Sequence, residues 1–586
     1  MATLPPFTDV KDLRMSSDPA LEAWLSHFLT ENNIAYALNP ALVASPEQMR
    51  FMVALEDDQI YIPCADDLFR QFYENSLSRD LIREYAKAWR FIATLVYGYG
   101  LSKPVRRRIL LLCRYRFQLY LASRTILPAR LIKRLVGIVL AQTGDADPFR
   151  EKKRQANRRM AKLLGDPAMR RLLFAQPSAE TETGKDGNRP SIPVQRWLLD
   201  YTELSRLFRL STRRDLWEKD ALLPDFEEEL AGPGKETECL HSLLGAEDRP
   251  RKKILYIPDV AGGFIVDGLI IRSLLRQGHQ VILALKEAFY FNTPTLADLE
   301  TDPALQGDHD DMHFLDDDRV SKNELLRLLR EYRLVVISDG TSEQMNLYRS
   351  SVTFARAWKE CDLVMTKGRR NAQVFLGSSH EFTRDILCFW REDAGLFRMR
   401  CKTKSRWVRK FSEHDLKRRA DEILERMREA RDTGKSVMFY SAIIGSIPGQ
   451  TKTAIEVVSA FVKALRERME NTFIINPAEH FAEGMDGDDL MYMWERVQRG
   501  GYLDVWRFQT VDDIEASFSL MGRRVPSAWL GKDATYSTGC TKEMHIALDV
   551  QRRHPELQII GPAAEKFFRR RDYGVGKYFD ASIVVK

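Results

Sequence analysis

The sequence has few cysteines and no regular spacing between them. Its seven cysteines include no CxxC pair, which excludes the closely spaced ligand sets of structural zinc sites and indicates no disulfide framework. A sparse, odd-numbered set is typical of a reducing compartment. Long apolar runs are also missing, since no stretch approaches the roughly 18 apolar residues of a membrane span and the N-terminus has no signal-peptide core. We therefore expect a soluble intracellular protein, most simply a cytoplasmic one.

The chain lacks a strong overall charge but concentrates its basic residues in one segment. A net charge of +6 over 586 residues does not predict nucleic-acid binding. Residues 103–171, however, hold 19 Lys and Arg against 4 Asp and Glu. This segment is either a surface for membranes or nucleic acid, or a buried helical face flanked by Lys and Arg whose stems lie along apolar surface. We favour the second interpretation and expect no nucleic-acid partner, because aromatic residues are not regularly interleaved as single-strand binding requires.

One stretch, residues 254–298, predicts the fold class. Its first four residues form an apolar, β-prone run, which a glycine-containing loop joins to an amphipathic helix at 265–276. Gly278 ends that helix, and a second strand follows at 280–285. Such β-loop-α-β units form parallel sheets covered by helices. Polar residues follow each strand, as expected for a doubly wound sheet that binds a ligand beyond the carboxyl ends of its strands.

The patterning divides the chain into four parts, as its length requires more than one ordinary core. Residues 1–230 show mainly helical patterning and residues 250–410 show α/β patterning. Residues 411–434 predict a charged helical connector, and residues 435–586 predict a second α/β domain. The expected fold class is therefore α/β, with a helical N-terminal domain, a doubly wound domain with a mainly parallel sheet, and a C-terminal α/β domain of unknown function.

The C-terminal part contains only weak motifs. Residues 445–453 resemble a phosphate-binding loop, but three residues instead of four separate the glycines and Lys452 comes two positions late. Cys540 would need a base and an electropositive pocket to be catalytic, and the sequence shows neither. We interpret the acidic cluster at 486–489 as a solvated loop and His480 as a structural histidine.

Four blocks of polar residues follow one another in a characteristic order. They comprise Asp147, Pro148, Phe149, Lys153 and Asn157; residues 259–263 (DVAGG) with Asp267; Lys286 with residues 292–298 (NTPTLAD); and residues 362–371 (DLVMTKGRRN). Over roughly residues 60–405 this pattern resembles the damage-control phosphatases, formerly catalogued as domain of unknown function family 89. The resemblance implies a helical part, an α/β domain and metal-dependent hydrolysis of small phosphorylated metabolites. No comparable resemblance covers residues 435–586.

The resemblance also implies roles for individual residues. Asp259 and Asp267 correspond to catalytic residues, and Asp259 also corresponds to a metal ligand. The groups that would hold the substrate or its phosphate are Lys286, Asn292, Lys367, Gly368, Asn371, Lys153 and Asn157. An active site of this family would use a divalent metal such as Mn²⁺, Co²⁺, Mg²⁺ or Ni²⁺.

The chain departs from the family at the metal ligands. The family holds its metal through the Asp and Asn of an Asp-Asn-Ala-Gly-Glu motif and the Asp of an Asn-Asp-x-Thr motif, whereas Val260 and Thr293 stand here in place of the second and third ligands. A hard cation needs oxygen ligands in near-octahedral geometry, and valine offers none while threonine offers only a neutral hydroxyl. We expect weak metal binding, and with it weak metal-assisted phosphoryl chemistry.

Three functions stay open at this stage. In the first, the domain is a pseudophosphatase that binds a phosphorylated metabolite or a protein partner without a cofactor. In the second, it is an active phosphatase whose metal site is rebuilt from Asp259, Asp267, Asp298 and Thr293. In the third, residues 435–586 carry an enzyme activity. We favour the first, so whether the chain is an enzyme stays open. The sequence does not specify the ligand, the protein partner or the oligomeric state.

Overall fold

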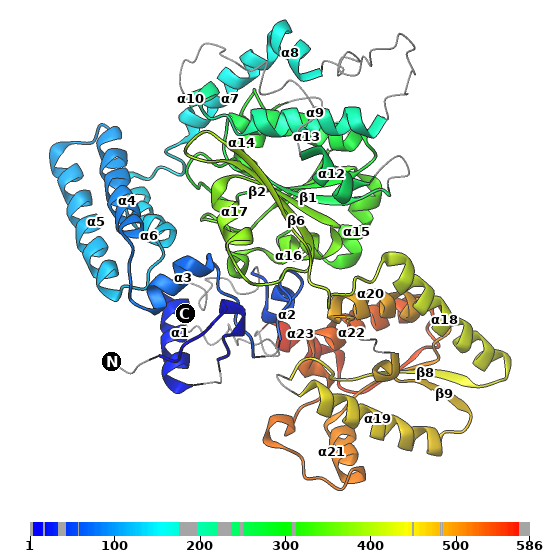
Figure 1. The fold of residues 1–586 in the computed structure, drawn as a ribbon. Helices are drawn as coiled ribbons and strands as arrows, with labels where there is room; N and C mark the ends of the chain where they lie inside the picture. The colour runs from blue at the N-terminus through cyan, green and yellow to red at the C-terminus, as the bar shows by residue number, and fades with distance from the viewer. Residues whose placement is uncertain are drawn as a thin grey trace, which may run out of the picture. The chain divides into compact units, whose positions relative to one another are not determined.

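The computed structural model contains two compact units, Met1–Trp407 and Val408–Lys586 (Figure 1). The residues that it describes are 4–15, 18–32, 43–56, 58–174, 196–218, 236–245, 250–306, 312–447, 450–480, 482 and 484–572. Each unit is built around a sheet dominated by parallel strands. The α/β class expected from the sequence is therefore confirmed.

The first unit contains a seven-stranded sheet in the order β3-β4-β2-β1-β5-β6-β7. Its strands are β1 (Lys253–Ile257), β2 (Gln280–Leu285), β3 (Met312–Leu315), β4 (Leu334–Ser338), β5 (Leu363–Lys367), β6 (Asp385–Arg391) and β7 (Phe397–Lys402). All neighbouring pairs are parallel except β6 and β7, which are antiparallel. The chain builds outward from β1 through β2 and later returns to place β5 on the other side of β1. The order of the strands thus reverses between β1 and β5, where open α/β sheets bind their ligands.

Both faces of this sheet are buried. Ile254 and Tyr256 belong to one apolar core and Leu255 and Ile257 to another, because successive side chains of a strand point to opposite faces. The helices of the first core are α7 (Arg150–Gly165), α8 (Pro167–Phe174), α9 (Arg196–Ser211), α10 (Asp215–Glu218), α12 (Glu236–Leu244), α13 (Gly263–Arg276) and α14 (Leu296–Thr301). The helices of the second core are α2 (Pro46–Met49), α15 (Lys322–Glu331), α16 (Val352–Glu360) and α17 (Arg369–Leu376) (Figure 1).

The helical part of the first unit therefore divides into two groups. Helices α7, α8, α9 and α10 lie within the expected helical domain, yet they share a core with the sheet. A separate core forms among the N-terminal segments at 10–28 and 60–139, with Phe289 packed into it. The expected boundary near residue 230 falls in 219–235, which lies outside the described residues, as does 246–249. The division of the chain into separate domains at 1–230, 250–410, 411–434 and 435–586 stays a prediction.

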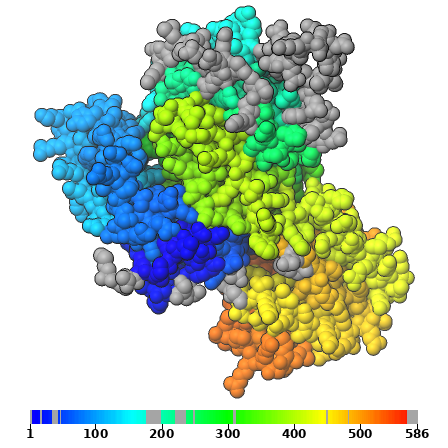
Figure 2. All heavy atoms as spheres, in the orientation of Figure 1, coloured from blue at the N-terminus to red at the C-terminus, as the bar shows by residue number. Residues whose placement is uncertain are grey.

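The N-terminal elements are η1 (Val10–Asp12), α1 (Pro19–Glu31), α2 (Pro46–Met49), α3 (Asp66–Tyr73), α4 (Arg79–Gly98), α5 (Lys103–Ser123) and α6 (Pro128–Thr143). Helix α4 begins where the Ser78 hydroxyl accepts a hydrogen bond from the Leu81 amide. Helix α5 ends at Arg124, which adopts a left-handed conformation with φ of 57°. Helices α4, α5 and α6 pack against one another and form the blue to light-blue part of the surface in Figure 2.

The second unit contains a four-stranded parallel sheet in the order β11-β10-β8-β9. Its strands are β8 (Ser436–Ser441), β9 (Thr472–Ile475), β10 (Val505–Phe508) and β11 (Gln558–Ile560). The other elements are α18 (Glu413–Asp432), α19 (Thr451–Arg468), η4 (Pro477–His480), α20 (Gly487–Gln498), α21 (Val511–Leu520), η5 (Ser527–Trp529), η6 (Ala534–Tyr536), α22 (Thr538–Arg553) and α23 (Ala564–Asp572).

Helix α18 occupies the segment that we expected to be a connector. Its apolar residues are few, but Leu416, Ile423 and Met427 belong to the main core of the second unit. They are spaced by seven and four residues, which places them on one side of the helix. The segment is therefore part of the packed unit.

Two expectations from composition can be compared with the structure. The structure joins Cys239 of α12 and Cys401 of β7 in a disulfide, which the irregular cysteine spacing did not lead us to expect. These residues are 162 positions apart, and only the packing of α12 near the sheet edge brings them together. In the parts of the chain that the structure describes, no helix is both long enough and apolar enough to cross a membrane.

Candidate functional site

The ends of β1 and β5 meet at a glycine. Asp259 lies two residues after β1, and Gly368 follows β5 directly with φ of +99°. A Cβ atom at position 368 would lie 2.3 Å from the Asp259 Cγ atom. Glycine tolerates both this backbone conformation and this close approach, whereas other residues do not. The two predicted site residues are thus in direct contact at the point where the strand order reverses.

An arginine neutralises the Asp259 carboxylate. The Arg214 Nη2 atom lies 2.8 Å from Asp259 Oδ2. Arg214 comes from the turn between α9 and α10, and Trp217 of the same segment packs so closely on the glycine loop that a Cβ at Gly262 would lie 2.4 Å from its indole ring. Neither residue belongs to a sequence motif. Sequence reasoning missed them because only tertiary folding brings residues 211–218 onto this loop.

Asp267 and Lys367 form an internal ion pair. The Lys367 Nζ atom lies 2.5 Å from Asp267 Oδ2, and the Tyr256 hydroxyl donates a hydrogen bond of 2.9 Å to Asp267 Oδ1. All three side chains are fully buried. Burial raises the pKa of Asp267 to about 6, although the contact with Lys367 lowers it, and burial lowers the pKa of Lys367. The charge of Asp267 and its hydrogen-bonding oxygens are therefore paired with Lys367 and Tyr256 inside the fold.

The other two predicted phosphate-binding lysines are also paired with carboxylates. Lys286 Nζ lies 2.6 Å from Asp339 Oδ2 and 2.6 Å from the Thr341 hydroxyl. Burial raises the pKa of Asp339, and the contact with Lys286 opposes that shift. Lys153 lies between two carboxylates, contacting Asp147 Oδ2 at 2.6 Å as well as Asp298. Each buried lysine thus has a carboxylate partner from within the chain.

The predicted asparagines connect the loops around the strand ends. The Asn157 side chain accepts a hydrogen bond of 2.6 Å from the Gly262 amide and donates one of 2.8 Å to Asp302. The Asn371 side chain donates to the Lys367 carbonyl at 3.0 Å. The Asn292 carbonyl accepts a hydrogen bond of 2.7 Å from the Ala261 amide. The structure therefore brings the four sequence blocks together at one edge of the sheet.

The residues at this edge do not fit a hard divalent cation. Val260 packs into the apolar core, and Gly263 has no side chain at the position of the family's Glu. Asp267 and Asp298 are each already paired with a lysine, Lys367 and Lys153 respectively. Among the residues that the structure describes, no group of three or more His, Cys, Asp and Glu side chains is arranged to hold a metal ion. A metal would need several oxygen ligands, of which only Asp259 is in place.

Comparison with protein families supports the fold. The profile of the damage-control phosphatase ARMT1-like domain matches residues 63–419, more than half of the chain. The chain belongs to this family. The resemblance expected from the sequence is thus confirmed. The family generally depends on a divalent metal and acts on small phosphorylated metabolites.

A solved structure of a DUF89 family protein from Pyrococcus horikoshii is similar to this chain at 18% sequence identity. The similarity covers 54% of this chain and 91% of that protein, with a TM-score of 0.35. No curated protein matches the chain.

The second unit has a buried acid near the carboxyl end of β8. Glu543 of α22 accepts a hydrogen bond of 2.9 Å from the Gln498 side chain, and burial raises its pKa to about 7. The neighbouring Cys540 thiol donates to the Ala442 carbonyl at 3.3 Å, and burial raises its pKa well above the usual range. A buried, protonated thiol is a poor nucleophile. Cys540 therefore shows no sign of the activation that catalysis needs.

The other weak motifs of the second unit have structural partners. The Asp486 carboxylate caps α20 by accepting a hydrogen bond of 3.0 Å from the Asp489 amide. The His480 ring packs edge-on against the Trp494 ring, with 5.4 Å between their centroids. Both observations agree with ordinary structural roles.

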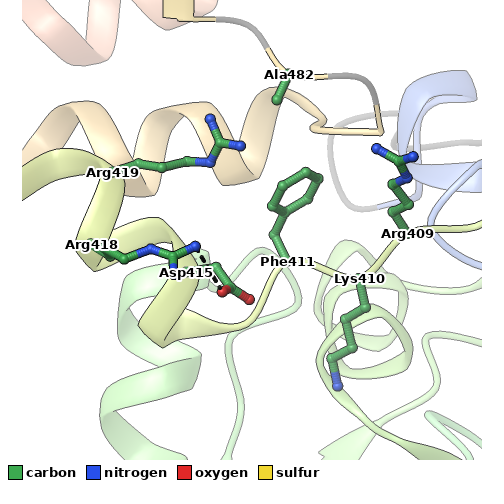
Figure 3. Close-up of a pocket in the computed structure, with 7 residues that line it drawn as sticks. All are labelled: Arg409, Lys410, Phe411, Asp415, Arg418, Arg419 and Ala482. Carbon is green, nitrogen blue, oxygen red and sulfur yellow. Dashed lines mark ion pairs between the residues drawn. The ribbon is translucent and has the colours of Figure 1, made fainter. Parts of the chain in front are cut away.

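Figure 3 shows a pocket of about 290 Å³ in the second unit. It is lined by Arg409, Lys410, Phe411, Asp415, Arg418, Arg419 and Ala482. The Phe411 ring lies 5.7 Å from the Arg419 guanidinium, and Asp415 lies 3.7 Å from Arg418. The lining offers cations, an aromatic ring and the Asp415 carboxylate, and it contains neither Cys540 nor Glu543.

Proposed function

We propose that the first unit is a degenerate damage-control phosphatase domain that binds a phosphorylated metabolite without hydrolysing it. The observation that carries the proposal is the Arg214–Asp259 ion pair at 2.8 Å. In an active family member this aspartate would bind the metal. Here a guanidinium supplies the positive charge, and Val260 and Thr293 cannot complete a metal site.

The charges at the site balance without a metal. Asp259 and Asp267 contribute two negative charges, and Arg214 and Lys367 contribute two positive charges. A divalent cation that binds Asp259 would have to displace or repel the Arg214 guanidinium, which is already paired with that carboxylate. Because metal-assisted phosphoryl transfer relies on the cation to neutralise developing charge, we expect no hydrolysis.

Positive charge also remains at the surface of this edge. Arg370 of α17 is exposed, and its guanidinium lies 4.9 Å from the Phe291 ring centroid and 5.6 Å from that of Tyr290. Arginine matches phosphate oxygens with its planar fork of donors. We therefore assign phosphate recognition to Arg370 and Arg214, while the buried lysines position the loops.

The first test measures bound metal and phosphate release with purified full-length protein. We expect no stoichiometric metal and no release from a panel of sugar phosphates in Mn²⁺, Co²⁺ or Mg²⁺. Inorganic phosphate should still stabilise the protein against heat, and Arg370→Gln should weaken that effect. Lys435→Gln, which alters an exposed cation of the second unit, is the control. Turnover that depends on metal and disappears in Asp259→Asn would overturn the proposal.

A gain-of-function variant makes the test sharper. Val260→Asn with Thr293→Asp restores the two family ligands, and Arg214→Gln removes the competing cation. We expect this triple variant to bind Mn²⁺ at least about tenfold more tightly than the natural protein, as typical for restored ligation. Arg214→Gln alone should not do so. If the natural protein already binds Mn²⁺ as tightly as the triple variant, the site is a rearranged metal centre instead.

A further inference from the structure

The outward face of α5 is apolar and exposed. Leu111, Tyr115 and Leu119 keep 57%, 63% and 48% of their surface accessible. They follow one another at four-residue intervals, so they form one stripe about 12 Å long on the helix. Leu112 and Val105 widen the stripe and are each 40% exposed. We call these five residues the α5 stripe. Figure 2 shows the light-blue surface that α4 to α6 form at the left of the view.

The opposite face of α5 already serves the core. Ile109 and Cys113 are fully buried, and the Cys113 thiol donates to the Leu135 carbonyl of α6 at 3.9 Å. The helix is therefore apolar on two sides, and only one of them is covered by α4 and α6. The buried face agrees with the interpretation favoured from the sequence, whereas the exposed apolar side was not expected. One helix of 21 residues has more apolar positions than two neighbouring helices cover.

The charge of α5 has one sign. The helix contains six Lys and Arg residues and no Asp or Glu. At 100° per residue, Arg107 and Arg114 lie along one edge of the α5 stripe and Arg116 lies along the other. The exposed Arg108 lies within the stripe, at an angle between Tyr115 and Leu119. A hollow of about 540 Å³ combines both kinds of group, since it is lined by Lys103, Pro104, Arg107, Arg108, Leu111 and Leu112.

We propose that α5 is an interfacial helix that docks on the surface of an anionic lipid bilayer. The α5 stripe would enter the boundary between headgroups and acyl chains, and the flanking arginines would contact lipid phosphates. This combination of exposed leucines, aromatic side chain and flanking cations on one helix is typical of helices that lie in the membrane interface. A flat anionic surface can meet the stripe and both of its basic edges at the same time.

Two other occupants fit less well. A second copy of this chain would bring one acid-free basic helix against another, and like charges repel. A nucleic acid would use arginines and stacked aromatic rings, whereas four of the five residues of the α5 stripe are aliphatic. An anionic bilayer therefore matches both the charge and the apolar character of the face.

The test is flotation of the full-length protein with vesicles of phosphatidylcholine alone and of phosphatidylcholine mixed with phosphatidylserine. We expect binding to the mixed vesicles, little binding to the neutral ones, and release at high salt. Leu111→Ser/Tyr115→Ser/Leu119→Ser should reduce partitioning by roughly a hundredfold. The matched control is Leu396→Ser/Leu520→Ser/Leu530→Ser, which removes three apolar side chains of 51%, 55% and 61% exposure elsewhere and should leave binding unchanged.

A second pair of variants tests the charges. Each basic residue near an anionic surface increases partitioning roughly fivefold, so Arg107→Gln/Arg116→Gln should reduce it about 25-fold. Arg552→Gln/Arg553→Gln removes two exposed arginines of α22 and is the control. Insertion can be followed with an environment-sensitive probe on Leu112→Cys, because the free cysteines that the structure describes are all buried. The probe emission should shift to the blue with mixed vesicles only.

Several results would overturn the proposal. One is the absence of binding to mixed vesicles, and another is binding that the stripe and arginine variants leave intact. Concentration-dependent self-association lost in the stripe variant would instead make this face a dimer interface. Tight binding of an oligonucleotide or an acidic protein that the same variants abolish, without vesicle binding, would assign the face to that partner.

Discussion

The two sheets of this protein treat buried charge differently at their carboxyl edges. In the first unit, Asp267 pairs with Lys367 and Asp339 with Lys286, so both of these buried carboxylates have a cation beside them. In the second unit, Glu543 receives a hydrogen bond from the neutral Gln498 amide, and burial raises its pKa to about 7. Both edges follow the same parallel α/β plan. The two lysines thus keep acids of the first edge paired, whereas the second sheet has both a paired acid, Asp513 with Arg507 at 2.7 Å, and Glu543, an acid that can be neutral.

The largest loss of stability should come from removing the lysine of a buried ion pair at the first edge. Lys153→Met leaves Asp147 and Asp298 without their shared cation. Removing one partner of a buried ion pair costs about 3–5 kcal/mol, and we expect the free energy of unfolding from urea titration to fall by that amount. Lys152→Met, at the exposed neighbouring position, is the control and should change it by less than about 0.5 kcal/mol. Equal losses in both variants would show that the pairing does not stabilise this edge.

At the second edge, the free energy of unfolding should depend on pH because of Glu543. The pKa of Glu543 is raised from 4.5 to about 7 by burial. Its contribution to stability is thus fully present below pH 4.5 and is lost as pH rises through about 7. Glu543→Gln cannot ionise, so it should gain about 3 kcal/mol of stability relative to the natural protein across this range. Urea titrations of both proteins at a series of pH values measure the difference, and parallel curves would place Glu543 in a solvated environment.

A smaller effect should come from the contact between strand ends at the first edge. Gly368 and Gly395 both have positive φ, but only at Gly368 would a Cβ meet another group, the Asp259 carboxyl. An alanine in a left-handed conformation costs roughly 1–2 kcal/mol by itself, so Gly395→Ala should lose about that much. Gly368→Ala should lose about 2 kcal/mol more, because the backbone there, with φ of 99° and ψ of 148°, suits essentially only glycine and the added Cβ would overpack Asp259. Thermal unfolding of the two variants measures this difference, and identical losses would mean that the loops separate easily.

Much of the fold could be predicted from local patterns. Residues 254–285 alternate strand, glycine turn and amphipathic helix, and the structure has β1, α13 and β2 there. The spacing of Lys153 and Asn157 places them on one face of α7, and both are buried at the site. Such features depend on the residues near them in sequence, which is why periodicity and turn chemistry suffice.

Other features depend on contacts between distant segments. Arg214 reaches Asp259 across 45 positions, and Cys239 reaches Cys401 across 162. Neither pair has a recognisable spacing. The role of α18 was also missed, because its charged surface concealed a regular apolar side that only the second core reveals.

Strand patterning and motif residues were enough to predict the α/β class and the family, because both are properties of the residues themselves. What surrounds Asp259, and which side of α5 stays exposed, follow from packing between distant segments. Arg214 neutralises Asp259 because the α9–α10 turn packs on the loop of Gly262 and Gly263 that follows β1, and the α5 stripe faces outward because α4 and α6 cover only the opposite side. The partners of a charge and the accessibility of an apolar face are set by packing between segments that the local sequence does not encode.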